Sequence, residues 1–98
     1  MNRFEAYYRR SLKRRLEELE ALARDLEDGV PRARAELDEA AHALKGSGRS
    51  FGFDAVSRAA EAVEQAGEDE LPAALAALVA VLREIAAGAP ADEAQAEA

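Results

Sequence analysis

The sequence predicts an all-α protein, an antiparallel up-down-up-down four-helix bundle. Its 98 residues are 49% hydrophobic, and most of these are Ala and Leu, which favour helices. Thr is absent and the strand-forming Val and Ile are few, which argues against a β fold. Four stretches repeat apolar residues at steps of three and four, the spacing of one helix face. A chain of this length has room for one core only, so we assign residues 1–88 to a single domain.

The first predicted helix covers residues 3–28 and is the longest of the four. Its apolar positions share one face: Phe4, Tyr8, Leu12, Leu16, Leu19, Leu22 or Ala23, and Leu26. Asn2 is a candidate N-cap. Gly29 suits the left-handed position that follows a helix, and Pro31 suits the first turn of the next one, so we expect a short connection there.

The second predicted helix covers residues 31–51, and its apolar stripe consists of Leu37, Ala41, Leu44, Gly48 and Phe51. Gly46 and Gly48 lie inside this helix, where each glycine costs roughly 1 kcal/mol relative to alanine. Two interior glycines in an alanine-rich chain therefore need a reason. Close helix packing explains the inward Gly48, whereas Gly46 points outward, at roughly 180° from the stripe.

A third helix is predicted over residues 55–66, with Asp54 as its N-cap and Gly67 at its end. Its inward residues are Val56, Ala59, Ala60 and Val63. Because the connections on both sides are short, each helix is expected to run antiparallel to the one before it.

The fourth predicted helix covers residues 70–87, with Asp69 as its N-cap and Pro72 in its first turn, where the missing N–H is harmless. Its apolar seam is unbroken: Leu71, Leu75, Leu78, Leu82 and Ile85. Across the bundle we expect these side chains to be buried: Leu12, Leu16, Leu19, Leu26, Leu37, Leu44, Phe51, Val56, Val63, Leu75, Leu78, Leu82 and Ile85.

The charge is unevenly distributed along the chain. The net charge of −7 disfavours nucleic acid as the main partner. Residues 1–50 hold eleven Lys and Arg against ten Asp and Glu, a net of +1, whereas residues 51–98 hold two against ten, a net of −8. Residues 89–98 contain no large apolar side chain, and we expect them to form a flexible, acidic, alanine-rich tail.

A basic run lies in the first predicted helix, at Arg9, Arg10, Lys13, Arg14 and Arg15. One interpretation is a solvated helix face that is neutralised one turn later by Glu17, Glu18 and Glu20. The other is a patch for nucleic acid or acidic lipid. Arg15 falls within the apolar stripe, so either its side chain snorkels to the surface or the first turns project past the end of the bundle.

Several classes of protein are excluded or disfavoured. The chain contains no Cys, so disulfides, thiolate metal sites and thiol catalysis are excluded. It has no apolar run of the ~20 residues that cross a bilayer, and its N-terminal stretch lacks the apolar core of a signal peptide. We therefore expect a cytoplasmic protein with no membrane partner. A metal site is not expected, because His42 and Asp38 supply two ligands at most.

His42 is the only histidine, and it falls roughly 140° from the apolar stripe, on the solvent side of its helix. Side chains one or two turns away surround it: Asp38, Glu39, Lys45, Gly46 and Arg49. Lys45 can neutralise an anion bonded to the ring, and Gly46 leaves the ring open to a docking protein. Asp38 or Glu39 is expected to accept the Nδ1–H and so present Nε2 as the nucleophile. Reversible phosphoryl transfer to histidine needs such charge neutralisation and clear approach.

The residues from His42 to Gly52 resemble the phosphorylation motif of histidine-containing phosphotransfer (HPt) domains. They read His-Ala-Leu-Lys-Gly-Ser, then Gly48, Phe51 and Gly52, against a family pattern of His-x-Leu-Lys-Gly-Ser, a small residue and a glycine at the helix end. Gly48 stands where the family commonly has Ala. A looser resemblance extends over residues 3–88.

The resemblance implies a helical bundle, usually monomeric, that accepts a phosphoryl group from a receiver aspartate or a sensor histidine kinase. The bundle then passes the group to a response-regulator receiver domain. It implies His42 as the phosphoacceptor, Lys45 as its charge partner, Gly46 as the clearance residue and Gly52 as a helix-end turn. Arg49 and Ser47 are candidates for the docking surface. No cofactor is expected on this chain, and Mg²⁺ is expected in the partner receiver domain.

Alternatives to the phosphotransfer interpretation stay open. The chain could be a non-catalytic helical adaptor, a pseudo-HPt domain that only binds a receiver or a kinase. A histidine kinase is excluded, because the chain is short and nothing after residue 52 resembles an ATP-binding glycine box. The chain would thus be a phosphoryl-group carrier without ATP-binding or autokinase activity. The basic run of the first helix is also a candidate for docking an acidic receiver surface.

Overall fold

The computed structural model describes residues 3–88, and the regular elements in this range are all α-helices. In chain order they are α1 (Arg3–Glu27), α2 (Ala33–Phe51), α3 (Asp54–Gln65) and α4 (Leu71–Ala86). The predicted N-cap Asn2 and the predicted tail 89–98 lie outside the described residues. None of the four helices combines the length and the apolar composition that crossing a membrane requires.

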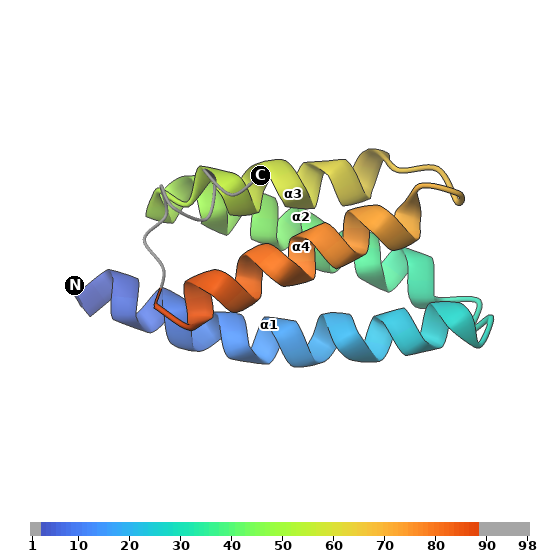
Figure 1. Cartoon of the computed structure of the whole chain (residues 1–98), viewed down its shortest axis with the longest axis horizontal. Coiled ribbons are helices and arrows are strands. Elements are labelled where there is room, and N and C mark those ends of the chain that lie inside the picture. Colours follow the sequence, from blue (N-terminus) through green and yellow to red (C-terminus); the bar gives the residue numbers. More distant parts are fainter. Residues whose placement is uncertain (1–2, 89–98) are drawn as a thin grey trace.

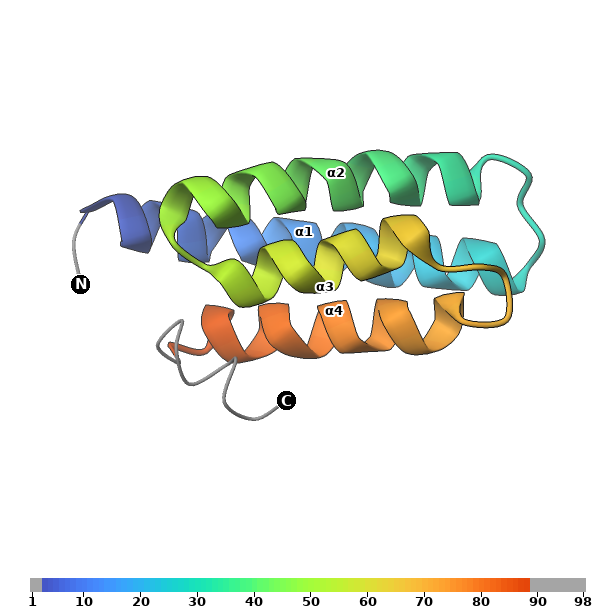
Figure 2. The ribbon, with the colours of Figure 1, turned by 90° about the horizontal axis from the view of Figure 1, so that it is seen from above.

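Successive helices run in opposite directions and lie side by side (Figures 1 and 2). Each helix packs against the helices before and after it, and α1 closes the bundle by packing against α4. The pair α2 and α3 forms the most extensive contact. The first turns of α1 extend past the end of the other three helices, as both views make visible. The predicted four-helix bundle is confirmed.

Two glycines end helices in the way the sequence predicts. Gly29, after α1, has φ +74°, and Gly52, after α2, has φ +82°, so both occupy the left-handed region that favours glycine. The N–H of Gly52 bonds to the carbonyl of Arg49 at 3.3 Å, and the N–H of Phe53 bonds to the carbonyl of Gly48 at 2.7 Å. The chain therefore reverses from α2 into α3 within two residues.

The two predicted aspartate caps are wrong. Asp54 is the first residue of α3 rather than its cap, and the N-cap positions of α3 and α4 are held by Phe53 and Glu70 without a side-chain cap. At α3 the carbonyl of Phe53 accepts the N–H groups of Val56 at 3.0 Å and Ser57 at 3.4 Å, so the helix begins one residue earlier than predicted and Asp54 lies inside it. At α4, a carboxylate oxygen of Glu70 instead accepts the N–H of Gly67 at 3.3 Å.

The core contains most of the side chains expected in it, with three corrections. Leu16, Leu26 and Phe51 are half-buried against the core rather than enclosed by it. Phe53 is 2% exposed and is the largest fully buried side chain, although its sequence position did not suggest it. The other large side chains that are fully enclosed are Leu12, Leu19, Leu37, Leu44, Val56, Val63, Leu78, Leu82 and Ile85, with Tyr8, Leu22, Leu71 and Leu75 nearly so.

Phe4 belongs to the predicted apolar stripe of the first helix, but the structure leaves it 69% exposed. It is the second residue of α1, whose first turns extend past the end of the other helices (Figures 1 and 2). Arg15 in the same stripe is half-buried and turns outward to bond Glu18 at 2.9 Å, in agreement with snorkelling.

Candidate functional site

His42 lies in the middle of α2 with its side chain 76% exposed. Its neighbours Ala41 and Leu44 are buried, since they belong to the stripe that packs into the bundle. Helix periodicity therefore presents the ring to solvent while the flanking residues anchor the backbone that carries it. The predicted exposure of His42 agrees with the structure.

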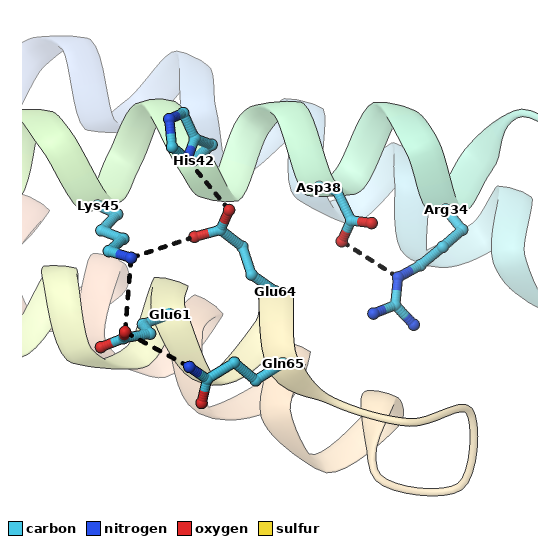
Figure 3. A network of polar contacts seen from close by, with 7 residues as sticks. All are labelled: Arg34, Asp38, His42, Lys45, Glu61, Glu64 and Gln65. Atoms are coloured by element: carbon cyan, nitrogen blue, oxygen red, sulfur yellow. Dashed lines mark hydrogen bonds and ion pairs between the residues drawn. The ribbon is translucent and has the colours of Figure 1, made fainter.

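The nearest partner of His42 is Glu64, which comes from α3. Nδ1 of His42 lies 3.1 Å from Oε2 of Glu64 (Figure 3). A carboxylate only accepts hydrogen bonds, so in the neutral ring this contact assigns the proton to Nδ1. The lone pair then resides on Nε2, the ring nitrogen not used in this contact.

Lys45 approaches the same carboxylate from the next turn of α2. Its Nζ lies 4.0 Å from Oε1 of Glu64 and 3.4 Å from Oε1 of Glu61. Figure 3 shows Glu64 between the ring and the ammonium, with one oxygen directed at each. Oε1 of Glu64 is buried and makes no hydrogen bond, so the Lys45 ammonium is the cation that offsets its charge. The site is thus a histidine, a carboxylate and an ammonium held by two helices.

The expectation that Asp38 or Glu39 orients His42 is wrong. Oδ1 of Asp38 bonds to Nε of Arg34 at 3.1 Å, and Arg34 also donates to the carbonyl of Ala66 at the end of α3, at 2.8 Å. A permanently charged guanidinium binds a carboxylate more strongly than a neutral imidazole does, so Arg34 takes this partner. Glu39 is exposed, and its position along α2 turns it to the flank opposite Lys45.

Glu64 had no signal in the sequence, because no spacing rule links residue 42 to residue 64. Its position depends on the contact between α2 and α3, where Gly48 meets Ser57. The hydroxyl of Ser57 donates to the carbonyl of Lys45 at 2.7 Å. A Cβ on Gly48 would lie 2.8 Å from that hydroxyl oxygen and 3.0 Å from the carbonyl oxygen of Phe53. Gly48 therefore allows a close approach of the two helices, and Glu64, seven residues after Ser57, shares the face that meets α2.

Gly46 differs from Gly48 in its surroundings. A Cβ built on Gly46 meets no atom within 4 Å, so the surface one turn after His42 is open. The outward position predicted for Gly46 and the packing explanation for Gly48 both agree with the structure.

The two predicted docking residues lie in different places. Arg49 is exposed, seven residues after His42 and so on the same face. Ser47 is half-buried and turned toward α1, where its Oγ lies 3.3 Å from the hydroxyl of Tyr8. Burial raises the pKa of Tyr8, and the bond to Ser47 and the charge of Arg15 oppose that shift. Ser47 thus lines the contact between α1 and α2 instead of the face that carries His42.

Between residues 3 and 88, no group of three or more His, Cys, Asp or Glu side chains is arranged to hold a metal ion. The carboxylates of Glu61 and Glu64 are engaged with Lys45 and His42.

Comparison with protein families gives one match, which covers most of the chain. The family model of the Hpt domain matches residues 6–88, and the chain belongs to that family. Membership implies a phosphotransfer role in two-component phosphorelays, with phosphorelay kinases and receiver domains as partners. No curated protein and no solved structure matches the chain.

Proposed function

We propose that His42 is the phosphoacceptor of this domain and that the chain carries a phosphoryl group to or from the aspartate of a receiver domain. The observation that carries this proposal is the contact of Nδ1 with Glu64 on an otherwise exposed ring. It directs the nucleophilic lone pair away from the partner carboxylate, and the open surface at Gly46 leaves room for another protein.

The transfer step follows from this arrangement. Nε2 of His42 attacks phosphorus in line as the bond from phosphorus to the aspartyl oxygen breaks, and the receiver aspartate leaves as a carboxylate. The ring keeps its proton on Nδ1 and gains a positive charge, which the carboxylate of Glu64 stabilises. Lys45 would exchange Glu61 for a phosphoryl oxygen, since its ammonium lies on a flexible stem one turn from the ring. Mg²⁺ bound to the receiver would neutralise charge on the aspartyl side, and this chain needs no cofactor.

A pseudo-HPt adaptor is the alternative function. It would bind a receiver or a kinase without chemistry, and it requires no oriented histidine. The pairing of His42 with Glu64, together with Lys45 and the clear approach at Gly46, favours transfer over binding alone. We further propose that the domain acts as a cytoplasmic monomer that does not use nucleic acid as a partner.

The test is phosphotransfer from a receiver domain loaded as its radiolabelled aspartyl phosphate. We expect wild-type protein to take up label in an acid-labile, alkali-stable linkage, as expected of a phosphoramidate. His42→Gln should fold with an unchanged helical spectrum and take up no label, because the side chain is exposed. Labelling of the Gln variant at the wild-type rate would overturn the assignment. Receiver binding by a wild-type chain that never becomes labelled would favour the adaptor.

A further inference from the structure

The first two turns of α1 expose large aromatic side chains. Phe4 is 69% and Tyr7 is 58% exposed, and among the described residues only Val30 is a further exposed large hydrophobic. Both aromatics lie near the N-terminal end of α1, three residues apart and so on neighbouring positions of one helix face. Among residues 3–88 these are the two most exposed large hydrophobic side chains, and neighbouring exposed apolar side chains are a feature of interaction sites.

Tyr7 also lines a groove between α1 and α2, with a volume of about 440 Å³. One wall is Tyr7, Ser11 and Arg14 of α1, and the other wall includes Ala43 and Ser47 of α2. Ala43 is exposed and directly follows His42 in the chain. The groove therefore reaches from the residue next to His42 to the exposed Tyr7.

Some cations of the basic run of α1 contact other residues of the bundle, and others do not. The guanidinium of Arg9 lies 5.3 Å from the ring centre of Phe53 and donates to the carbonyl of Ile85, whereas Arg15 bonds Glu18. Arg10, Lys13 and Arg14 are without hydrogen bonds or ion pairs to the rest of residues 3–88. Of the glutamates expected to neutralise the run, Glu18 pairs with Arg15 at 2.9 Å, whereas Glu20 pairs with Arg83 of α4 at 3.7 Å.

The free cations face different sides of α1. Arg14 lies seven residues after Tyr7 and lines the groove beside it, with Arg10 on the neighbouring exposed surface. Lys13 lies seven residues before Glu20 and shares the face that meets α4. Two cations without partners among residues 3–88, Arg10 and Arg14, thus lie on the side of α1 that carries Tyr7 and the ion pair of Arg15 with Glu18, although the chain as a whole carries −7.

We propose that the receiver domain docks across the flank of His42 that faces α1, with Phe4 and Tyr7 as apolar anchors and with Arg10 and Arg14 as steering charges. The inference rests on His42 being the phosphoacceptor. A stable protein contact needs about 800 Å² from each partner, so it must extend from the ring onto one flank. The α3 flank presents Glu61 and Glu64, which pair with Lys45 and His42 and outnumber the cation between them. On the α1 flank the cations Arg10, Arg14 and Arg15 outnumber the acidic Glu18 and Glu39. An aspartyl phosphate and the carboxylates that bind its Mg²⁺ are anionic, so the α1 flank is the complementary one.

The test measures transfer from the loaded receiver domain that labels the wild-type chain fastest. The double variant Phe4→Ala/Tyr7→Ala should lose about tenfold in kcat/KM, through KM, because aromatic anchors carry much of the binding energy of an interface. The double variant Arg10→Gln/Arg14→Gln should lose several-fold at low salt and show a flatter salt dependence. Lys13→Gln and Val30→Ala are matched controls for charge and apolar exposure, and both should stay within about twofold of wild type.

A second readout separates docking from the chemistry of the ring. Phosphoramidate is a small donor that needs no docking surface, so every one of these variants should label His42 with it at the wild-type rate. Equal loss with both donors, or wild-type kcat/KM in both double variants, overturns the docking surface while leaving the phosphoacceptor assignment intact. The surface would instead belong to a membrane interaction if wild type binds phosphatidylglycerol vesicles, both double variants lose this binding, and transfer from the receiver is unchanged in them. A wild-type chain labelled by neither donor would remove the phosphoacceptor and this inference together.

Discussion

Oε2 of Glu64 lies 3.1 Å from Nδ1 of His42, although the two residues are 22 positions apart in the chain and belong to neighbouring helices. Because Glu64 belongs to α3 and His42 to α2, the state of the ring depends on how these two helices pack. The same carboxylate lies 4.0 Å from Nζ of Lys45, so the anion that orients the ring also interacts with the cation beside it.

Replacing Glu64 should slow phosphotransfer without unfolding the bundle. Glu64→Ala removes the acceptor of the Nδ1 proton, so the ring populates the tautomer that carries its proton on Nε2. We expect a loss of about tenfold or more in the rate at saturating receiver, less than the ~10⁴ of a buried triad aspartate, because Glu64 remains 24% exposed. Nitrogen NMR of His42 would report the tautomer directly. Asp38→Asn is the control, and the assignment fails if that variant slows transfer as much as Glu64→Ala does.

Gly46→Ala should separate stability from activity. The added methyl group meets open space, so the helix gains roughly 0.4–1 kcal/mol and the Tm should be equal or higher. The same methyl stands one turn from the ring, where a receiver must bring phosphorus within ~3–3.5 Å, so transfer should be slower. Gly46→Gln should barely transfer. A Gln variant that is destabilised, yet transfers at the wild-type rate per folded molecule, would make Gly46 structural.

Gly48→Ala should have the opposite effect on stability. Its Cβ would lie 2.8 Å from Oγ of Ser57 and 3.0 Å from the backbone oxygen of Phe53, and that oxygen cannot turn aside. Overpacking of this kind costs about 1–3 kcal/mol and exceeds the helix gain of up to ~1 kcal/mol. Thermal unfolding of Gly48→Ala, measured together with Gly46→Ala and wild type, should give Gly48→Ala a Tm several degrees below that of wild type. An unchanged Tm would mean that the two helices separate there at no cost.

Tyr8 should make the fold sensitive to alkaline pH. Burial raises the pKa of its hydroxyl, so above about pH 10 the unfolded chain releases this proton before the folded chain does. The free energy of unfolding should therefore be unaffected by this group at neutral pH and fall as the pH rises past 10. At pH 8 the variant Tyr8→Phe should have a free energy of unfolding about 0.5–1.5 kcal/mol lower than wild type, because it lacks the hydrogen bond to Ser47. Between pH 8 and pH 11, however, the free energy of unfolding should fall less in this variant than in wild type. Denaturant unfolding at pH 8 and pH 11 measures both losses. The prediction is contradicted if wild type and Tyr8→Phe lose the same free energy of unfolding between the two pH values.

Properties that depend on one helix at a time could be predicted from the sequence. Periodicity along α2 places His42 and Gly46 outward and Leu44 and Gly48 inward, because successive residues turn by about 100° whatever the helix packs against. The turn at Gly52 is also local, since a left-handed backbone position favours glycine. For these reasons the fold class and the outward position of His42 follow from residue order alone, whereas its role as candidate phosphoacceptor rests on the resemblance of residues 42–52 to the HPt motif.

Contacts between helices were decided by the tertiary structure. Phe53 is buried and Phe51 half-buried because the turn at Gly52 directs the ring of Phe53 into the end of the bundle. There it contacts Tyr8 and Arg9. Glu64, rather than Asp38, reaches His42 because Gly48 and Ser57 bring α2 and α3 close enough for a side chain to cross. Helix geometry sets which residues share a face, but the relative positions of two helices depend on side-chain packing across the whole interface, which no spacing in the sequence encodes.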